Sequence, residues 1–183
     1  MRTPPPTGTR RISPPPNTPA VGVLNRPARL AAAAAIASAL AVDIIVKRLM
    51  LAEADSWDNR TIAPGFLDTH YAYNRGVSFS LFWQNTSLGS ETLAALQMIF
   101  IATLAVLAFR THKPLVAAGL GFIIGGALGN IADRLGMGAV FDFLVVRFGA
   151  TPFFVCNSAD LFISLGVIVL GVDMLFVKEP KPA

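Results

Sequence analysis

Three aspartates, Asp133, Asp142 and Asp160, lie close together in the sequence, at or near the ends of two long apolar segments. Two asparagines, Asn130 and Asn157, accompany them. An ionisable side chain at the edge of a membrane is costly unless it is paired or used, so these residues are candidates for a functional site. Two neighbouring carboxyl groups can share one proton, and such a pair is suited to general acid–base chemistry.

Asp142 is the aspartate for which a purely structural role is hardest to find. It interrupts residues 139–146, an otherwise apolar and strand-like stretch, where a carboxylate stabilises nothing obvious. Asp133 could instead form only an ion pair with the adjacent Arg134 at the membrane interface. The sequence therefore leaves a structural and a functional interpretation of Asp133 open.

The residues around Asp160 also admit a structural explanation. Asn157 or Ser158 precedes an apolar run and could simply cap a helix, with Asp160 in the first turn favoured by the helix dipole. Cys156 is the only cysteine, has no redox or zinc spacing, and is interpreted as a small packed thiol. These features alone do not separate a catalytic Asp160 from a capping one.

The composition is that of an integral membrane protein. Hydrophobic residues make up 54% of the 183 residues, charged residues make up 14%, and the mean hydropathy is +0.58. The net charge is +4, but the basic residues lie mainly in the tails and one connecting loop, without an aromatic-interleaved stripe. We therefore expect no nucleic-acid partner, and we interpret the basic residues as topology signals.

Four segments are long and apolar enough to span a bilayer, which requires about 20 residues each. They cover residues 30–51, 92–109, 115–132 and 159–176. The expected fold class is an all-α membrane protein, with four transmembrane helices and a small extracytoplasmic β-rich segment between helices 1 and 2. That segment, residues 66–82, is rich in aromatic and β-favouring residues, with a possible turn at Gly76.

Basic residues predict the orientation of these helices. In a four-helix arrangement the basic tails and the turn near residue 112 fall on one side, which the positive-inside rule assigns to the cytoplasm. Both termini are then cytoplasmic, and the carboxylate cluster faces the outer leaflet. We expect a disordered Pro/Arg-rich cytoplasmic tail over residues 1–29, a membrane domain over 30–177 and a cytoplasmic tail over 178–183. An alternative makes the N-terminal tail plus residues 30–42 a secretory signal with an AxA-like cleavage site at residues 52–54, but Asp43, Lys47 and Arg48 lie between the apolar run and that site.

The third span carries Gly121, Gly125 and Gly129 at intervals of four residues, which places them on one helical face. Small residues at this spacing allow two helices to approach closely in a membrane. The first span offers a matching small surface over residues 31–35. We therefore expect close packing between the two spans and assign these glycines no chemistry.

Five motifs occur in a fixed order along the chain: DxxxK from Asp43, YNRGVSFSLF from Tyr73, GGALGNIADR from Gly125, VFDF from Val140 and NSAD from Asn157. In this combination the chain resembles lipoprotein signal peptidase, the type II signal peptidase of bacteria. The resemblance covers the chain from the first span to the fourth. It implies a four-helix aspartic endopeptidase of the bacterial cytoplasmic (inner) membrane. Such an enzyme removes signal peptides from diacylglyceryl-modified prolipoproteins before the lipidated cysteine, with no cofactor and no metal.

The resemblance also assigns residue roles. It places the catalytic pair on Asp142 and Asp160, and we expect Asp160, near a helix N-terminus, to be the ionised member. Supporting polar positions fall on Asp43, Asn74, Asn130, Asp133, Arg134 and Asn157. Membrane lipids and lipid-modified prolipoproteins are the expected partners, and we expect the enzyme to act as a monomer.

The chain departs from the family's pattern at three places: Ile44 replaces the usual Gln, NRGVSFS replaces NTGAAFS, and Cys156 replaces Phe. None of these changes affects the predicted catalytic carboxylates. A proton-coupled transporter would more often carry its carboxylates near the bilayer midplane and show an internal repeat. A membrane scaffold would not explain Asp142. Serine or cysteine proteolysis and a zinc site are disfavoured, because His70 and His112 fall on opposite sides of the membrane in this topology.

Overall fold

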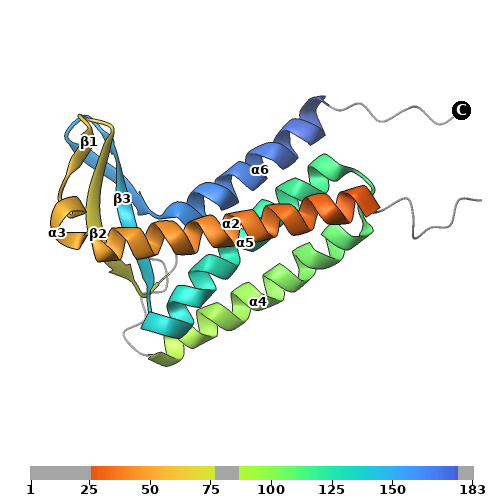
Figure 1. Cartoon of the computed structure of the whole chain (residues 1–183), viewed down its shortest axis with the longest axis horizontal. Coiled ribbons are helices and arrows are strands. Elements are labelled where there is room, and N and C mark those ends of the chain that lie inside the picture. The colour runs from red at the N-terminus through yellow and green to blue at the C-terminus, as the bar shows by residue number, and fades with distance from the viewer. Residues whose placement is uncertain (1–25, 77–86, 177–183) are drawn as a thin grey trace, which may run out of the picture.

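The computed structural model describes residues 26–76 and 87–176, and four long helices dominate it (Figure 1). The helices are α2 (Arg26–Ala52), α4 (Ser87–Arg110), α5 (Pro114–Met137) and α6 (Ser158–Phe176). All four are long and apolar enough to cross a membrane, α4 over Glu91–Arg110. The four predicted spans are thus confirmed as helices. α2 begins at Arg26, so the last residues of the predicted tail are helical, whereas residues 1–25 and the predicted tail at 178–183 lie outside the described residues.

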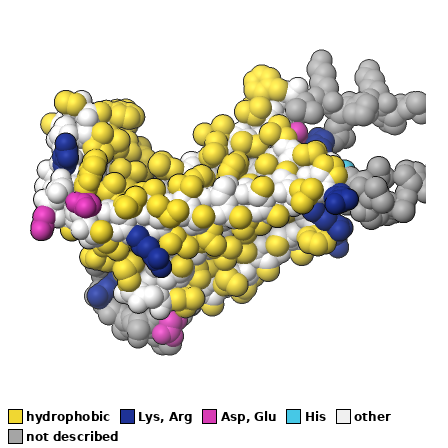
Figure 2. Space-filling model, in the orientation of Figure 1, with side chains coloured by type: hydrophobic (Ala, Val, Ile, Leu, Met, Phe, Trp, Pro, Cys, Tyr) yellow, Lys and Arg dark blue, Asp and Glu magenta, His cyan; other side chains and the backbone are white. Residues whose placement is uncertain are grey.

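Helix α5 is the centre of the bundle. Most of its side chains are buried, whereas the other three helices expose most of theirs. The exposed side chains along the helices are mainly hydrophobic (Figure 2). In water such a surface would be unfavourable, but it matches the hydrocarbon of a bilayer. Pro114 begins α5 and Gly138 ends it, with φ 71° and its N–H donating to the Arg134 carbonyl.

Close approach of α2 and α5 depends on the glycine face of α5, as predicted. A Cβ atom on Gly121 would lie 2.6 Å from the Ala32 carbonyl oxygen. A Cβ atom on Gly125 would lie 2.7 Å from the Ala39 Cβ. Real Cβ atoms do not approach other atoms this closely, so only glycine permits this packing. The predicted small surface on the first span is therefore confirmed, and it extends one turn beyond Ala35.

A four-stranded antiparallel sheet lies at the end of the bundle where α5 finishes and α6 begins (Figure 1). Its strands, in spatial order, are β1 (Thr61–Ala63), β2 (Leu67–Asn74), β3 (Val140–Phe148) and β4 (Thr151–Cys156). The predicted β-rich segment is confirmed over Leu67–Asn74, and its part from residue 77 onward lies outside the described residues. The all-α class was too narrow, because β3 and β4, between α5 and α6, complete the same sheet.

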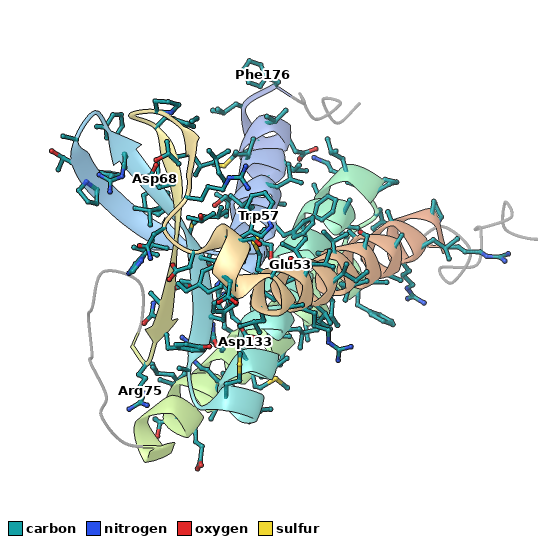
Figure 3. All side chains as sticks on the ribbon, turned by 60° about the vertical axis from the view of Figure 1, so that its left-hand side comes forward. Glu53, Trp57, Asp68, Arg75, Asp133 and Phe176 are labelled. Atoms are coloured by element: carbon teal, nitrogen blue, oxygen red, sulfur yellow. The ribbon has the colours of Figure 1, made fainter. Side chains whose placement is uncertain are left out.

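Aromatic packing fixes the sheet against the helices. Phe141 is fully buried, and the Tyr71 ring meets it edge-on with 5.0 Å between centroids. The Tyr71 hydroxyl donates a hydrogen bond to the Met50 carbonyl near the end of α2. Between α2 and the sheet the chain forms the short helix α3 (Ala54–Trp57), where Trp57 lies beside the strands (Figure 3). These contacts hold β3 rigidly, and Asp142 lies on β3.

Candidate active site

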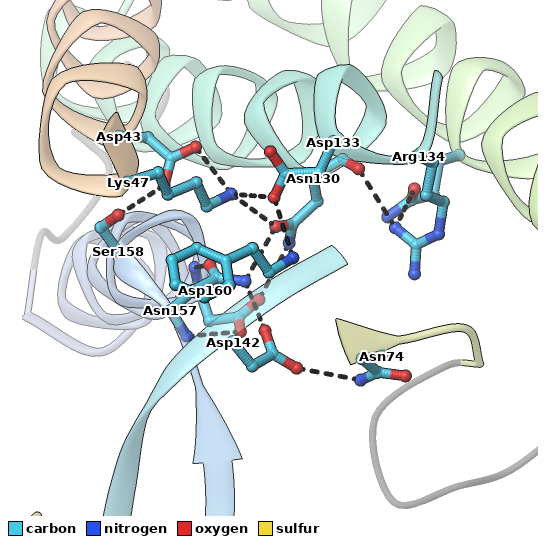
Figure 4. Close-up of polar contacts among 12 residues, drawn as sticks. Asp43, Lys47, Asn74, Asn130, Asp133, Arg134, Asp142, Asn157, Ser158 and Asp160 are labelled. Atoms are coloured by element: carbon cyan, nitrogen blue, oxygen red, sulfur yellow. Dashed lines mark hydrogen bonds and ion pairs between the residues drawn. The ribbon is translucent and has the colours of Figure 1, made fainter. Parts of the chain in front are cut away.

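Every site residue predicted from the sequence lies in one connected polar network (Figure 4). α2 supplies Asp43, α5 supplies Asn130, Asp133 and Arg134, the strands supply Asn74 and Asp142, and α6 with its cap supplies Asn157 and Asp160. The network lies where the last turns of α5 meet the sheet and the first turn of α6. The fold therefore brings together residues that are more than 100 positions apart in sequence.

Asn157 binds both predicted catalytic carboxylates. Its side-chain Nδ2 donates to Asp142 Oδ1 at 2.6 Å, and its backbone N–H donates to Asp160 Oδ2 at 3.2 Å. Both carboxylates therefore lie around the same residue, and the charge of Asp160 is close enough to affect Asp142. Asp142 is 3% exposed, so the pair is shielded from bulk water on the β3 side.

Asp160 is held by a reciprocal capping arrangement at the start of α6. Asn157 Oδ1 accepts from the Asp160 backbone N–H at 3.1 Å, while Asp160 Oδ2 accepts from the Asn157 backbone N–H. The structural interpretation of Asn157 as a helix cap is therefore confirmed. It is also compatible with a functional role, because the cap fixes the position of the Asp160 carboxylate. Ser158 does not cap the helix in this way, and its hydroxyl donates to Asp43 Oδ1 at 2.5 Å.

Asn74 and Asn130 each present an amide Nδ2 to one carboxylate. Asn74 Oδ1 accepts from the Gly76 N–H at 3.0 Å, so its Nδ2 faces Asp142 Oδ2 at 3.1 Å. Asn130 Nδ2 donates to Asp160 Oδ1 at 3.0 Å. Together with Asn157, these residues give all four carboxylate oxygens of Asp142 and Asp160 an N–H donor. Such donors orient the two carboxylates and stabilise negative charge on them.

Lys47 is a site residue that the sequence analysis used only as part of a motif. It is 4% exposed and forms ion pairs with Asp43 at 2.9 Å and with Asp133 at 2.7 Å. Its ammonium also donates to Asn130 Oδ1 at 3.3 Å. The spacing of Asp43 and Lys47, one helical turn apart, was the signal that could have identified this pair.

The ion pair between Asp133 and Arg134, which the sequence left open as a structural interpretation, is not among the contacts of either residue in the described part of the chain. Asp133 pairs with Lys47 because its side chain points toward α2. Arg134 instead donates to the Gly76 carbonyl oxygen and to Gln97 Oε1, both at 3.0 Å. No motif in the sequence pointed to Gln97, which reaches the network from α4.

Burial sets the acidity of Asp142. Burial, with a smaller contribution from the nearby charge of Asp160, raises the pKa of this carboxyl from 3.8 to about 6. Hydrogen bonds from Asn74 and Asn157 and the positive charge of Lys47 oppose this rise. A carboxyl group with a pKa near 6 can hold a proton close to neutral pH, which suits general acid–base chemistry.

Cys156 does not have the properties of a nucleophile. It is 3% exposed, and burial together with the Asp160 and Asp142 charges raises its pKa to about 12. His70 lies on β2, whereas His112 lies in the turn between α4 and α5 at the other end of the helices. The two histidines therefore lie at opposite ends of the helices and cannot act together at Cys156.

Comparison with known proteins connects this geometry to one family. The family model described as signal peptidase (SPase) II matches residues 35–176. The lipoprotein signal peptidase of Beijerinckia indica is 42% identical over 118 residues, covering 64% of this chain and 70% of that protein. The lipoprotein signal peptidase of Ectopseudomonas mendocina is 33% identical over 147 residues, covering 79% of this chain and 86% of that protein.

The fold is also similar to that of a solved bacterial membrane enzyme. The TM-score is 0.67 at 21% sequence identity, and the similarity covers 83% of this chain and 94% of the other. The four apolar helices and the small sheet are thus an architecture already known from a bacterial membrane. With the matched motifs, they make this chain a multi-pass membrane protein of bacteria. The chain belongs to the signal peptidase II family, the proteases that remove signal peptides from prolipoproteins.

Proposed function

We propose that this protein is an aspartic endopeptidase whose catalytic dyad is Asp142 and Asp160. The observation that carries this proposal is the position of Asn157, which donates to both carboxylates from a single residue. Two carboxyl groups held this closely cannot both ionise cheaply, so the pair shares one proton near neutral pH. The N-terminus of α6 favours negative charge on Asp160. When the pair holds one proton, Asp142 therefore carries it.

The dyad hydrolyses the peptide bond in two steps. The ionised Asp160 takes one proton from a water molecule while the water oxygen attacks the scissile carbonyl carbon. The protonated Asp142 donates its proton to the carbonyl oxygen, which gives a tetrahedral diol. In the second step the ionised Asp142 takes a proton from one diol hydroxyl, so that the C=O bond forms again, while the C–N bond breaks and the Asp160 carboxyl gives its proton to the leaving amine nitrogen. The dyad then again holds one proton.

The remaining polar residues hold the dyad in place. Asn74, Asn130 and Asn157 keep the carboxylates in place through the N–H donors described above. Arg134 binds the Gly76 carbonyl next to Asn74 and so fixes the strand end beside the dyad. Asp43 and Asp133 act at a greater distance, through Lys47.

The membrane setting favours a lipid-modified substrate. The dyad lies where the helices end and the sheet begins, and the helices beneath it expose mainly hydrophobic side chains (Figure 2). Acyl chains on the cysteine that follows the scissile bond would remain in the bilayer and hold the carbonyl at the depth of the dyad. Lipids and diacylglyceryl-modified prolipoproteins are thus the proposed partners.

The charge distribution supports the proposed orientation. Arg26, Arg29 and Arg110 are exposed at the end of the bundle opposite the sheet, where Figure 2 shows Lys and Arg side chains gathered. The positive-inside rule places that end in the cytoplasm, so the dyad faces the extracytoplasmic side of the inner membrane. Residues of one chain supply every contact of the site described above, so the dyad is complete without a second copy, and a monomer is the proposed state of the enzyme.

The direct test of this function uses the purified protein in a lipid-containing detergent mimic. The substrates are a prolipoprotein carrying the diacylglyceryl group and the same precursor with an unmodified cysteine. We expect cleavage before the cysteine of the lipid-modified form and far slower cleavage of the unmodified form. Equal rates for the two precursors would contradict lipid-dependent recognition, and the absence of cleavage of both would contradict the proposed function.

A further inference from the structure

Lys47 contacts supporting groups of both proposed catalytic carboxylates, Asn130 for Asp160 and Asp133 for Asp142. It is on α2, it is almost fully buried, and its ammonium lies between Asp43, Asp133 and Asn130 (Figure 4). Removing a lysine from water is costly, and even with two ion partners a buried ion pair is often no more stabilising than apolar side chains of similar size. The position of Lys47 therefore calls for an explanation beyond charge neutralisation.

The first route runs from Lys47 to Asp160 through Asn130. An ammonium group can only donate hydrogen bonds, so the atom of the Asn130 amide that faces Lys47 must be Oδ1. The Asn157 Nδ2 donates to the same oxygen at 3.1 Å. With Oδ1 fixed in this direction, Nδ2 of Asn130 must face the Asp160 carboxylate, as observed.

The second route runs from Lys47 to Asp142 through Asp133. Oδ2 of Asp133 accepts from Lys47 and also from the backbone N–H of Phe141 at 3.2 Å. Phe141 directly precedes Asp142 on β3, and its ring is fully buried. Asp133 thus ties the start of β3 to the ammonium, and Asp142 follows the position of that strand.

We infer that Lys47 is a positioning residue that sets the relative placement of Asp142 and Asp160, by orienting Asn130 on one side and anchoring Asp133 and β3 on the other. This inference rests on the proposed function, because it assigns Lys47 a role in the reaction of that dyad. The positive charge of Lys47 also lowers the pKa of Asp142 and so opposes the larger effect of burial. The charged groups of this network are Asp43, Asp133 and Arg134 on the helices, with Asp142 on β3 and Asp160 on α6.

The test compares Lys47→Met with Arg48→Met, its matched control. Arg48 is the next residue of α2 and is exposed, so its substitution removes one positive charge without touching the network. With the lipid-modified precursor, Lys47→Met should lower kcat by roughly 10- to 100-fold with little change in KM, which is the usual effect of losing a residue behind a reactive group. The acid limb of its kcat–pH profile should move to higher pH, because a charge favouring the ionised dyad is lost.

Lys47→Met leaves Asp43 buried without its cation, so the double variant Lys47→Met/Asp43→Asn is measured beside it. The double variant is charge-balanced, and Asp43→Asn alone is its control. We expect the double variant to fold and to keep the low kcat, whereas Lys47→Arg, which retains charge and donors, should recover part of it.

The inference is overturned if folded Lys47→Met has the same kcat and the same acid limb of the kcat–pH profile as Arg48→Met. It is also overturned if the folded double variant matches Asp43→Asn in both quantities. A purely structural Lys47 would reduce the amount of folded protein and leave both quantities unchanged for each folded molecule. Wild-type protein that fails to cut the lipid-modified precursor would contradict the proposed function instead, so the two failures are distinguishable.

Discussion

Replacing Asp142 with asparagine should make the protein more stable at mildly alkaline pH. The Asp142 carboxyl is 3% exposed, and burial raises its pKa from 3.8 to about 6. A pKa that is raised in the folded state means that folding is favoured by the protonated form. The contribution of the protonated Asp142 carboxyl to the free energy of unfolding is fully present below the unfolded pKa and is lost as the pH rises through about 6.

The size of the effect follows from the shift. A rise from 3.8 to about 6 corresponds to about 3 kcal/mol of unfolding free energy lost at high pH. Asparagine avoids this loss because it carries no charge at any pH. Its Nδ2, however, would face one of the two donors that now bind the carboxylate, at a cost of about 1 kcal/mol. Asp142→Asn should therefore be about 1 kcal/mol less stable than wild type near pH 4 and about 2 kcal/mol more stable near pH 8.

The assay is unfolding by SDS in mixed micelles, followed by tryptophan fluorescence at several pH values. Asp55→Asn is the matched control, because Asp55 is an exposed carboxylate on α3 and its loss should not change the pH dependence of stability in this way. The quantity compared is the difference in unfolding free energy between variant and wild type. If this difference is the same at about pH 4 and pH 8, the claim that ionisation of Asp142 destabilises the folded protein is refuted.

Two further predictions concern packing and topology. A Cβ atom on Gly129 would overlap the Asp43 carboxylate, so Gly129→Ala should break a buried ion pair and cost roughly 3 kcal/mol in SDS unfolding. Gly136→Ala, on the same helix with nothing within 4 Å of its Cβ, should be neutral or slightly stabilising, and equal losses for both would contradict the packing argument. In a cysteine-free background, Asp55→Cys should react with a membrane-impermeant thiol reagent from outside spheroplasts, and His112→Cys should not. The reverse pattern would invert the proposed orientation.

The helices could be predicted from sequence because their signals are local. A run of about 20 apolar residues identifies a span whatever surrounds it. The glycine face of α5 could be predicted for the same reason, since a spacing of four residues already places Gly121, Gly125 and Gly129 on one side of a helix. The structure adds which surface they meet, namely the small residues of α2.

The sheet could be predicted only in part, because its pairing is not local. β2 lies between α2 and α4, whereas its partner β3 lies between α5 and α6, and the register places Ala72 opposite Asp142. No periodicity within either segment indicates that they pair. In the segment that forms β4, the sequence was interpreted only through the thiol of Cys156, and the strand itself was not predicted.

For the site, too, the local information could be predicted from sequence and the spatial contacts could not. The motifs identified the residues, but they could not show which side chains face each other. Asp133 and Arg134 are adjacent, so an ion pair between them was a natural expectation, yet successive residues of a helix point about 100° apart and these two reach different partners. Lys47 acquires its importance only when α2 packs against α5 and brings it to Asn130 and Asp133.

The central claim is that Asp142 and Asp160 together perform the cleavage. The measurement that tests it most directly is the rate of cleavage of the diacylglyceryl-modified precursor by Asp142→Asn and Asp160→Asn, with Asp133→Asn as the control. Asparagine keeps the shape of aspartate but cannot hold the shared proton, so both dyad variants should be folded and should lose cleavage altogether. Asp133→Asn should be slower or less stable through its contact with Lys47 but should still cleave. Substantial cleavage by folded Asp142→Asn or Asp160→Asn would remove that residue from the dyad and contradict the proposed mechanism.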